Sequence, residues 1–294
     1  MRASIVLTPA ESKRLIAKAI VKTGEIKRAL EKAYIILCEG SINVMIAQEL
    51  FGLDIECKDF TSGMVTGGVV CTSGLSSSRT RMKVSFIDSS KPKIWATHPL
   101  VAYKGKIVGF SHKKAIEDFH IDTVIIKGGN AIDKDGNVGV IVGGYDGGVI
   151  AQIMGHCVSQ GVKIVCPIGL EKSVFSVRDA ARHTGGKRFD YSMGADYGLF
   201  IVSNADVVTE IEAIKILSSA DAFHVASGGI GGSEGAVVLS CEGSTDEVNT
   251  IIKIIKKIKG EPPQKGRRQK CNTCKYINCI FHGKEEESLP KWMM

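Results

Sequence analysis

Short apolar runs, Gly-rich turns and helical patterns follow one another along most of the chain, and this alternation constrains its fold more than any other feature. The clearest example is the apolar run 34–38, followed by the polar turn Glu39-Gly40-Ser41-Ile42-Asn43 and then by a helical pattern over 44–51. A strand, a turn and a helix in this order are the repeating unit of parallel sheets. The sequence therefore predicts an α/β protein with a mostly parallel sheet flanked by helices.

The same reasoning assigns elements to the rest of the chain. The run Thr8-Pro9-Ala10-Glu11 predicts a helix start, because Thr8 and Glu11 can form a capping box and Pro9 fits the first helical position. Residues 60–80 are rich in Gly, Ser and Thr, which predicts a mobile loop or lid. Further strands are predicted at 69–71, 83–87, 101–110 (as a hairpin), 123–126, 138–142, 162–166, 199–202, 222–226 and 236–241, and further helices at 25–32, 115–119, 149–160, 174–183, 210–218 and 247–258.

Charge and composition divide the chain into three parts. We expect an α/β ligand-binding domain over 1–259, a basic linker over 260–270 and a small metal-binding tail over 271–294. The net charge is +7, and all of it comes from residues 253–294, so the preceding part is neutral. Because residues 1–252 are neutral, they show no general nucleic-acid footprint, whereas the basic linker and tail would suit RNA or an acidic protein partner.

The sequence also predicts the compartment. No apolar run reaches the roughly 18 residues that a membrane span needs, and the first residues lack the apolar core of a signal peptide. We therefore expect a cytoplasmic protein without a membrane partner. Six of the nine cysteines are scattered among apolar segments, so we interpret them as buried thiols that stay reduced in the cytosol.

Glycines cluster in three loops, at 39–43, at 127–137 with 143–148, and at 227–235. In an open parallel sheet, ligands bind at the carboxyl ends of the strands, where glycine lets the backbone approach and a helix N-terminus favours an anion. The loops therefore predict a site for a small anionic ligand, although each is also compatible with an ordinary tight turn. The predicted ligand-binding residues are Gly40, Ser41, Asn43, Gly128, Gly129, Asn130, Asn137, Gly143, Gly144, Gly147, Gly148, Gly229, Gly231, Gly232 and Ser233.

Three segments resemble one fold superfamily. The segment Cys38–Asn43 resembles the phosphate loop of ribose-5-phosphate isomerase and glucosamine-6-phosphate deaminase. The stretch 122–126, continuing through 133–138, resembles the strand and D-x-x-G-N turn of family I coenzyme A transferases. The glycines of 229–235 are similar to the Gly-rich turn of the second half of these transferases. The resemblance implies an enzyme of the isomerase or acyl-transferase type, acting on a phosphorylated or coenzyme A-linked substrate.

The resemblance also suggests catalytic residues. The transferases form a thioester on a glutamate, and Glu39 and Glu234 are the glutamates in Gly-rich turns. A sugar-phosphate isomerase would need a carboxylate base near a lysine, for which Lys127 with Asp133 or Asp135 would serve. The alternatives are an exposed lysine and a solvated hairpin turn. A basic stretch could bind an anionic substrate or form a solvated helix face; it comprises Arg178, Arg182, His183, Lys187 and Arg188.

The remaining three cysteines lie close together in the tail. Cys271 and Cys274 have the two-residue spacing at which two thiolates chelate one ion, and Cys279 and His282 follow. Three cysteines and a histidine complete a zinc site, whereas three cysteines alone could hold an iron–sulfur cluster. A redox-active C-x-x-C without metal is the remaining interpretation. The whole chain thus predicts an enzyme, with a non-catalytic ligand sensor that binds RNA or a partner and an iron–sulfur redox protein as alternatives.

Overall fold

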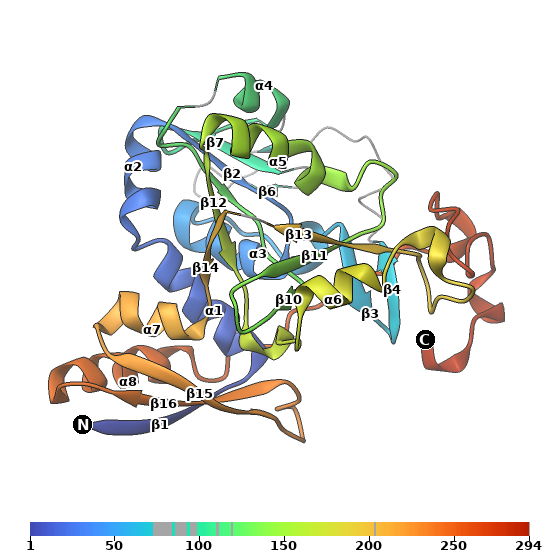
Figure 1. Ribbon diagram of the computed structural model, residues 1–294. Helices are drawn as coiled ribbons and strands as arrows, with labels where there is room; N and C mark the ends of the chain where they lie inside the picture. Colours follow the sequence, from blue (N-terminus) through green and yellow to red (C-terminus); the bar gives the residue numbers. More distant parts are fainter. Residues whose placement is uncertain are drawn as a thin grey trace.

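The computed structural model describes residues 1–72, 84–85, 93–94, 99–109, 112–118, 120–202 and 204–293 (Figure 1). In chain order its helices and strands are β1 (Arg2–Leu7), α1 (Pro9–Ile20), α2 (Gly24–Lys32), β2 (Tyr34–Leu37), α3 (Ser41–Phe51), β3 (Gly63–Thr66), β4 (Val69–Thr72), β5 (Val84–Ser85), β6 (Lys93–Ile94), β7 (Leu100–Tyr103), β8 (Lys106–Gly109), α4 (His112–Glu117), β9 (Val124–Ile126), β10 (Ala131–Ile132), β11 (Val138–Val142), α5 (Gly148–Gln160), β12 (Lys163–Pro167), α6 (Val177–Arg182), β13 (Gly198–Val202), β14 (Ala205–Val208), α7 (Glu210–Ser218), β15 (Asp221–Gly228), β16 (Ala236–Glu242) and α8 (Thr245–Ile258).

A six-stranded sheet forms the centre, in the order β14-β12-β9-β2-β7-β8. The neighbours from β14 to β2 are parallel, whereas β7 pairs antiparallel with both β2 and β8. The α/β prediction is thus confirmed, and the largest sheet is mixed, with mostly parallel strands. The hairpin β7–β8, with its turn at Lys104-Gly105, lies where the sequence predicts it.

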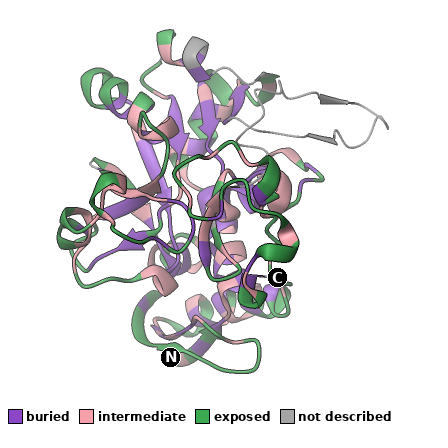
Figure 2. Cartoon of the chain, turned by 90° about the vertical axis from the view of Figure 1, so that its right-hand side faces the viewer, coloured by how far each residue is buried: buried purple, intermediate pink, exposed green. Residues whose placement is uncertain are grey.

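Both faces of this sheet are covered, which explains its continuous apolar strands. Because side chains alternate along a strand, Ile35 and Leu37 enter one hydrophobic core with α1, α3 and α7. Ile36 and Cys38 enter a second core with α5, β11 and β13. Figure 2 shows the buried residues concentrated in the central strands and the elements facing them.

The smaller sheets are antiparallel, and two of them have three strands; the sequence prediction did not include such sheets. β11 pairs with β10 and β13, and β16 lies between β1 and β15. The second of these sheets packs on α1, α7 and α8 at the lower end of Figure 1. Apolar runs do not distinguish parallel from antiparallel pairing, since both produce buried strands. The strands β1 and β14 were not predicted.

The helix starts follow their sequence signals. Thr8, Thr209 and Ser244 cap α1, α7 and α8, and each forms a capping box with the glutamate three residues later. The predicted lid contains the hairpin β3–β4, with Gly67 and Gly68 at its turn; both have positive φ, which favours glycine. Residues 73–80 of that prediction, and most of the strand predicted at 83–87, lie outside the described residues.

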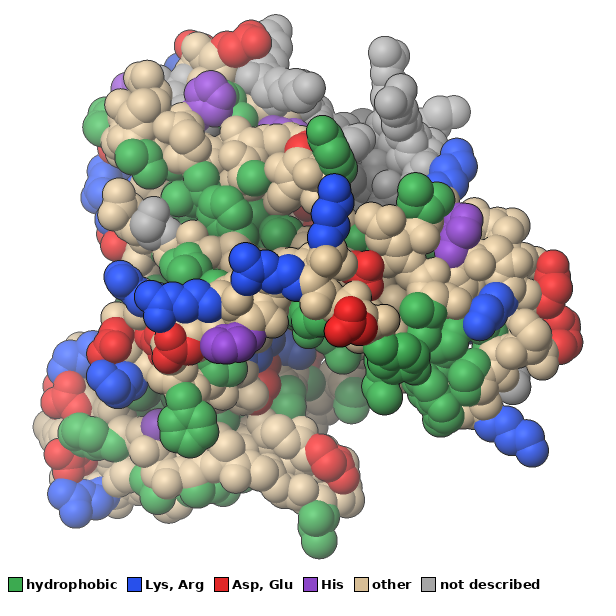
Figure 3. Space-filling view, turned by 45° about the vertical axis from the view of Figure 1, so that its right-hand side comes forward, with side chains coloured by type: hydrophobic (Ala, Val, Ile, Leu, Met, Phe, Trp, Pro, Cys, Tyr) green, Lys and Arg blue, Asp and Glu red, His purple; other side chains and the backbone are tan. Residues whose placement is uncertain are grey.

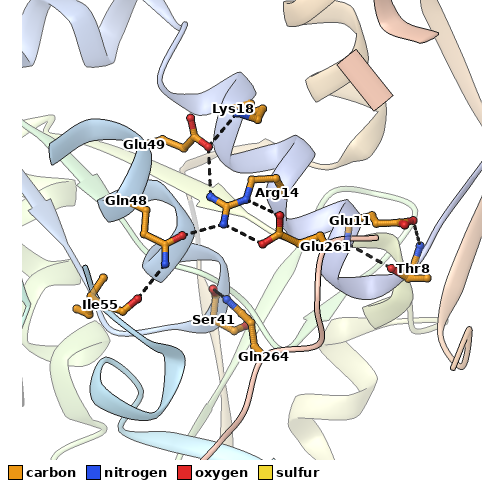
Figure 4. Close-up of polar contacts among 10 residues, drawn as sticks. All are labelled: Thr8, Glu11, Arg14, Lys18, Ser41, Gln48, Glu49, Ile55, Glu261 and Gln264. Atoms are coloured by element: carbon orange, nitrogen blue, oxygen red, sulfur yellow. Dashed lines mark hydrogen bonds and ion pairs between the residues drawn. The ribbon is translucent and has the colours of Figure 1, made fainter. Parts of the chain in front are cut away.

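The linker and tail pack against the main body. Arg14 of α1 contacts Glu261 through two hydrogen bonds of 3.0 and 2.9 Å, and also contacts Glu49 and Gln48 of α3 (Figure 4). Farther along, Gln264 donates a hydrogen bond to the backbone of Ser41 (Figure 4). The last residues lie beside β3 and β4 in Figure 1. The tail is therefore docked on the body in this structure.

Candidate functional site

A cavity of about 510 Å³ lies at the carboxyl ends of β2 and β9. This volume is typical of sites for small ligands. The loop 39–43 after β2 and the loop 127–130 after β9 line it together. Because β2 and β9 are parallel neighbours, their following loops leave the sheet at the same edge. The position agrees with the rule for ligand sites in open α/β sheets.

A buried asparagine fixes the first loop. The side-chain amide of Asn43 donates hydrogen bonds to the carbonyl oxygens of Cys38 at 2.7 Å and Ile126 at 3.2 Å, so it joins the ends of the two strands. The N–H of Gly40 donates to the carbonyl of Phe60 at 3.0 Å. These bonds hold the start of α3 at the cavity, where its partial positive charge favours an anion.

Three lysines from three different elements line the same cavity: Lys13 of α1, Lys127 after β9 and Lys172 after β12. The ammonium group of Lys172 donates a 2.8 Å hydrogen bond to the carbonyl oxygen of Gly129. Burial lowers the pKa of Lys172, and the charges of Lys13 and Lys127 lower it further, against the opposing effect of Glu171 and Glu210. A cluster of like charges at a cavity is stabilised when an anion binds between them.

Two carboxyl groups near these lysines are buried. Glu39 lines the cavity, and burial raises its pKa, opposed by its own backbone and by Lys127. Glu210 is fully buried at the start of α7 and accepts a 3.0 Å hydrogen bond from the N–H of Leu170. Burial, followed by the nearby charge of Glu171, raises the pKa of Glu210 to about 7. A carboxyl group with a raised pKa can exchange a proton near neutral pH.

Part of the predicted site converges on this cavity. Of the predicted catalytic residues, Glu39 and Lys127 line it, and Asp133, Asp135 and Glu234 do not. The predicted ligand-binding residues that line the cavity are Gly40, Ser41, Asn43, Gly128, Gly129, Asn130 and Gly143. The others lie elsewhere: Asn137 in the β10–β11 turn, Gly144 and Gly147 between β11 and α5, Gly148 at the first position of α5, and Gly229, Gly231, Gly232 and Ser233 between β15 and β16.

Asp133 stabilises the local structure through hydrogen bonds. Its carboxylate accepts hydrogen bonds from the N–H groups of Asp135 and Asn137 and from the side-chain amide of Asn137, and it accepts a 2.9 Å bond from the N–H of Val177. Burial raises the pKa of Asp133, but these hydrogen bonds outweigh burial and lower it. Asp133 thus closes the β10–β11 turn and caps the start of α6. Asp135 is exposed and pairs with Lys134.

The third Gly-rich loop belongs to the antiparallel sheet. It connects β15 to β16, and Glu234 in it is bonded to the N–H of Gly232 at 3.0 Å. Ile230 is 87% exposed, so the loop stands in solvent. The motif resembles a phosphate turn, but no helix follows it and β16 pairs on both sides with antiparallel strands. Local sequence did not reveal this difference.

Several cavity residues were missed by sequence reasoning, among them Lys13, Lys172, Gln264 and Tyr276. One signal was present for Lys172, because it follows β12 as Lys127 follows β9, and the two strands are parallel neighbours. The phenolic hydroxyl of Tyr276 donates to the carbonyl oxygens of Gly143 and Asp196. Gln264 and Tyr276 belong to the linker and tail, whose position over the cavity was not predictable.

A second, small cavity of about 20 Å³ lies beside the first. The predicted metal ligands Cys271, Cys274, Cys279 and His282 all line it, together with Cys71 of β4. In the described part of the chain, no three His, Cys, Asp or Glu side chains stand in the arrangement of a metal site. The guanidinium of Arg268 donates a 3.1 Å hydrogen bond to the sulfur of Cys271.

The basic residues of the linker are partly engaged within the chain. Arg267 pairs with Asp59 at 3.7 Å and Arg268 with Glu286 at 2.5 Å. On the face shown in Figure 3, basic side chains are interspersed with acidic ones. In the predicted basic stretch, Arg182 pairs with Asp179, and neither Arg178 nor Lys187 lines the central cavity.

Comparison with known proteins does not assign this chain to a family. No protein-family model, no curated protein and no solved structure matches this chain. The resemblance to the isomerase and coenzyme A transferase superfamily therefore stays a prediction. Within the described residues, no helix is long and apolar enough to cross a membrane.

Proposed function

We propose that the central cavity binds a small phosphate-bearing molecule and that the chain is an enzyme acting on it, of the isomerase or acyl-transferase type. The observation that carries the proposal is the convergence of Lys13, Lys127 and Lys172 on a cavity bordered by the start of α3. Three lysines line the cavity against two carboxyl groups, the buried Glu39 and the half-buried Asp196, so the cationic groups are in excess and favour an anion.

Glu39 is the group that we assign to proton transfer. It lies at the carboxyl end of β2, and its pKa is raised by burial, so it can carry a proton at a pH where an exposed glutamate would not. Lys127, which follows the neighbouring strand, is suited to neutralising charge that develops on the substrate. Coenzyme A-linked substrates fit the same argument, because their carboxyl or phosphate groups are anionic.

A thermal-shift series tests binding. Inorganic phosphate, sugar phosphates and coenzyme A are compared with the corresponding neutral sugars, each at increasing concentration. A ligand that binds only the folded state at about 100 times its Kd adds about 2.7 kcal/mol of stability. We expect at least one phosphate-bearing ligand to raise the melting temperature and its neutral counterpart to have no effect. No response to any of the anionic ligands would contradict the proposal.

Matched lysine variants locate the site. Lys172→Met and Lys13→Met remove cavity cations, whereas Lys187→Met removes an exposed lysine of the 3₁₀ turn Gly186–Arg188. We expect the cavity variants to bind the ligand at least about tenfold more weakly, since a hydrogen bond to a charged group contributes about 1.5–3 kcal/mol. Lys187→Met should bind like the wild type. Equal affinities in all three variants would show that the ligand binds outside the central cavity.

Glutamate variants separate binding from chemistry. Once a ligand is found, Glu39→Gln should keep its affinity within a few fold but lose turnover, because the amide cannot exchange the proton. Glu234→Gln, in the exposed β15–β16 turn, should leave both unchanged. Loss of turnover in Glu234→Gln but not in Glu39→Gln would reverse the assignment. A ligand that binds without any turnover would favour a sensor.

A second candidate function is supported by one observation. Cys71, Ala195 and Tyr276 line both the central cavity and the small thiol-lined cavity. A metal held by the tail cysteines, whether zinc or an iron–sulfur cluster, would therefore lie beside the proposed substrate. With a cluster there, the protein would serve redox chemistry on that substrate.

A further inference from the structure

We propose that Cys71, Cys271, Cys274 and Cys279 together hold a thiophilic metal centre, either a single Zn²⁺ or an iron–sulfur cluster. The tail supplies three of the thiolates, and the body supplies the fourth through β4. Sequence spacing had pointed to His282 as the fourth ligand. The centre does not depend on the identity of the ligand in the central cavity.

The placement of the four thiols supports this ligand set. All four line one cavity of about 20 Å³, although they lie as far apart in the sequence as 71 and 279. Cys71 is on the second strand of the β3–β4 hairpin. The 3₁₀ turn Cys271–Thr273 presents Cys271 and Cys274, and the N–H of Gly283 donates a 2.9 Å hydrogen bond to the carbonyl of Cys271. Two separate parts of the chain thus contribute cysteines to the lining of one cavity.

Two hydrogen-bond donors reach the sulfur atoms of the tail cysteines. Arg268 donates to the sulfur of Cys271 at 3.1 Å, and its side chain, only 17% exposed, is held in place by Glu286. The N–H of Tyr276 donates to the sulfur of Cys274 at 3.4 Å. Cationic and N–H donors to sulfur are the usual outer contacts of thiolate-bound metals, whose ligand basicity and potential they adjust.

The tail has little regular structure and little buried apolar surface of its own. Beyond residue 260, the described residues form only three short 3₁₀ turns. The hydrophobic cluster of this region contains only Val69, Cys271, Phe281, Leu289 and Met293 as buried members. Chain segments below about 40 residues rarely bury enough apolar surface to fold without a metal or disulfides. A centre that includes Cys71 would fix the tail to the β3–β4 hairpin.

The volume of the cavity bears on the identity of the metal. A cavity of about 20 Å³ holds a body of about the size of one water molecule. A single ion therefore fits with small side-chain rotations of the cysteines. A four-iron cluster is larger than this cavity and would require the four cysteine side chains to spread apart around it. Both occupants use the same four thiolates, and metal analysis separates them.

The test is metal analysis of the full chain, purified without oxygen and, in a parallel sample, reconstituted with zinc or with iron and sulfide. We expect one zinc per chain, or four irons with four sulfides and a brown colour; either result supports the centre and identifies its occupant. X-ray absorption at the metal edge should show sulfur ligands only. A protein that retains neither metal, or a nitrogen or oxygen ligand in the first shell, would overturn the proposal.

Three variants test the fourth ligand. Cys71→Ser should lower the metal retained after chelator treatment more than about tenfold, whereas Cys57→Ser should retain the wild-type amount. Cys57 is the matched control, because it is also half-buried and lines the central cavity but not the thiol-lined one. His282→Ala should also retain the metal. The reverse pattern, with metal lost in His282→Ala and kept in Cys71→Ser, refutes the ligand set. If Cys71→Ser fails to fold, the count of sulfur ligands in the wild type decides.

Discussion

The side-chain amide of Gln264 donates a 2.8 Å hydrogen bond to the backbone carbonyl oxygen of Ser41, across 223 positions of sequence. Ser41 is the first residue of α3, and both residues line the central cavity. The linker therefore crosses the site that the Gly-rich loop after β2 forms. Any ligand in the cavity lies under a segment that connects the main body to the cysteine tail.

We predict that Gln264→Ala loosens this segment. One neutral hydrogen bond contributes about 1 kcal/mol, which corresponds to a roughly fivefold increase in the population of the opened linker. Trypsin under native conditions measures this opening, because Lys265, Arg267 and Arg268 follow directly. Cleavage of the linker should be roughly fivefold faster in Gln264→Ala. Gln160→Ala, at the exposed end of α5, should be cleaved like the wild type; equal rates in both variants would mean that the contact does not hold the linker.

Arg14 should contribute more to stability than any exposed ion pair. It is 15% exposed and contacts Glu49 and Glu261 at 3.2 and 2.9 Å (Figure 4). Arg14→Met leaves the half-buried Glu261 without this partner and Glu49 with Lys18 alone, and we expect urea unfolding to show a loss of about 2–3 kcal/mol. Arg2→Met removes an arginine that is 74% exposed and pairs with Glu242, so its loss should stay below about 1 kcal/mol. Similar losses of unfolding free energy in both variants would mean that burial does not strengthen the ion pairs of Arg14.

Asp133 and Asp135 lie two residues apart, and we predict that their contributions to the free energy of unfolding differ sharply. Asp133→Ala removes the acceptor of several N–H groups, including that of Val177, and should cost about 2 kcal/mol of unfolding free energy at neutral pH. Asp135→Ala removes an exposed carboxylate and should change the free energy by less than about 0.5 kcal/mol. Neither should weaken ligand binding in the cavity. A selective loss of turnover in the folded Asp133→Ala variant would restore Asp133 as a catalytic residue.

The pKa of Asp133 is lowered in the folded protein, so the contribution of Asp133 to the free energy of unfolding depends on pH. The contribution is present above the ordinary pKa of 3.8 and is lost as the pH falls through the lower value of the folded state. The stability difference between wild type and Asp133→Ala should therefore shrink in strong acid. A difference that stays constant down to full protonation would contradict the hydrogen-bond origin of the effect.

Sequence patterns predicted most of the helices and strands. Of the three Gly-rich loops, the sequence placed two correctly at the cavity. Loops 39–43 and 127–130 follow buried strands of the parallel part of the sheet, so the rule about carboxyl ends applies to them. The rule does not apply to 227–235, because β16 pairs with β1, and a strand near residue 5 was not predicted. Pairing partners are set by tertiary packing, which a local pattern does not encode.

The sequence also could not predict which lysines line the cavity. Lys13 lies on a helix whose periodicity shows only that its face is half-buried, and its distance from Lys127 depends on how α1 packs. Cys71 lies in a Gly-rich segment far from the tail cysteines, so their spacing could not include it. Spacing motifs identify ligands that are close in sequence, whereas a ligand from another element becomes visible only when the fold is known.

Glu210 should make the stability of the ligand-free protein fall as the pH rises. Its folded pKa is about 7 against an ordinary value of 4.5, so the folded state binds more protons between these values, and unfolding becomes easier as the pH increases through them. The full effect is on the order of 3 kcal/mol between about pH 4.5 and pH 8. Glu210→Gln keeps an acceptor for the N–H of Leu170 but carries no charge, so urea unfolding of this variant at pH 5 and pH 8 should lack most of the decline. Glu31→Gln, on the exposed end of α2, should decline like the wild type. If Glu210→Gln and the wild type lose the same stability between the two pH values, Glu210 is ionised in the folded protein and the assignment of its raised pKa is wrong.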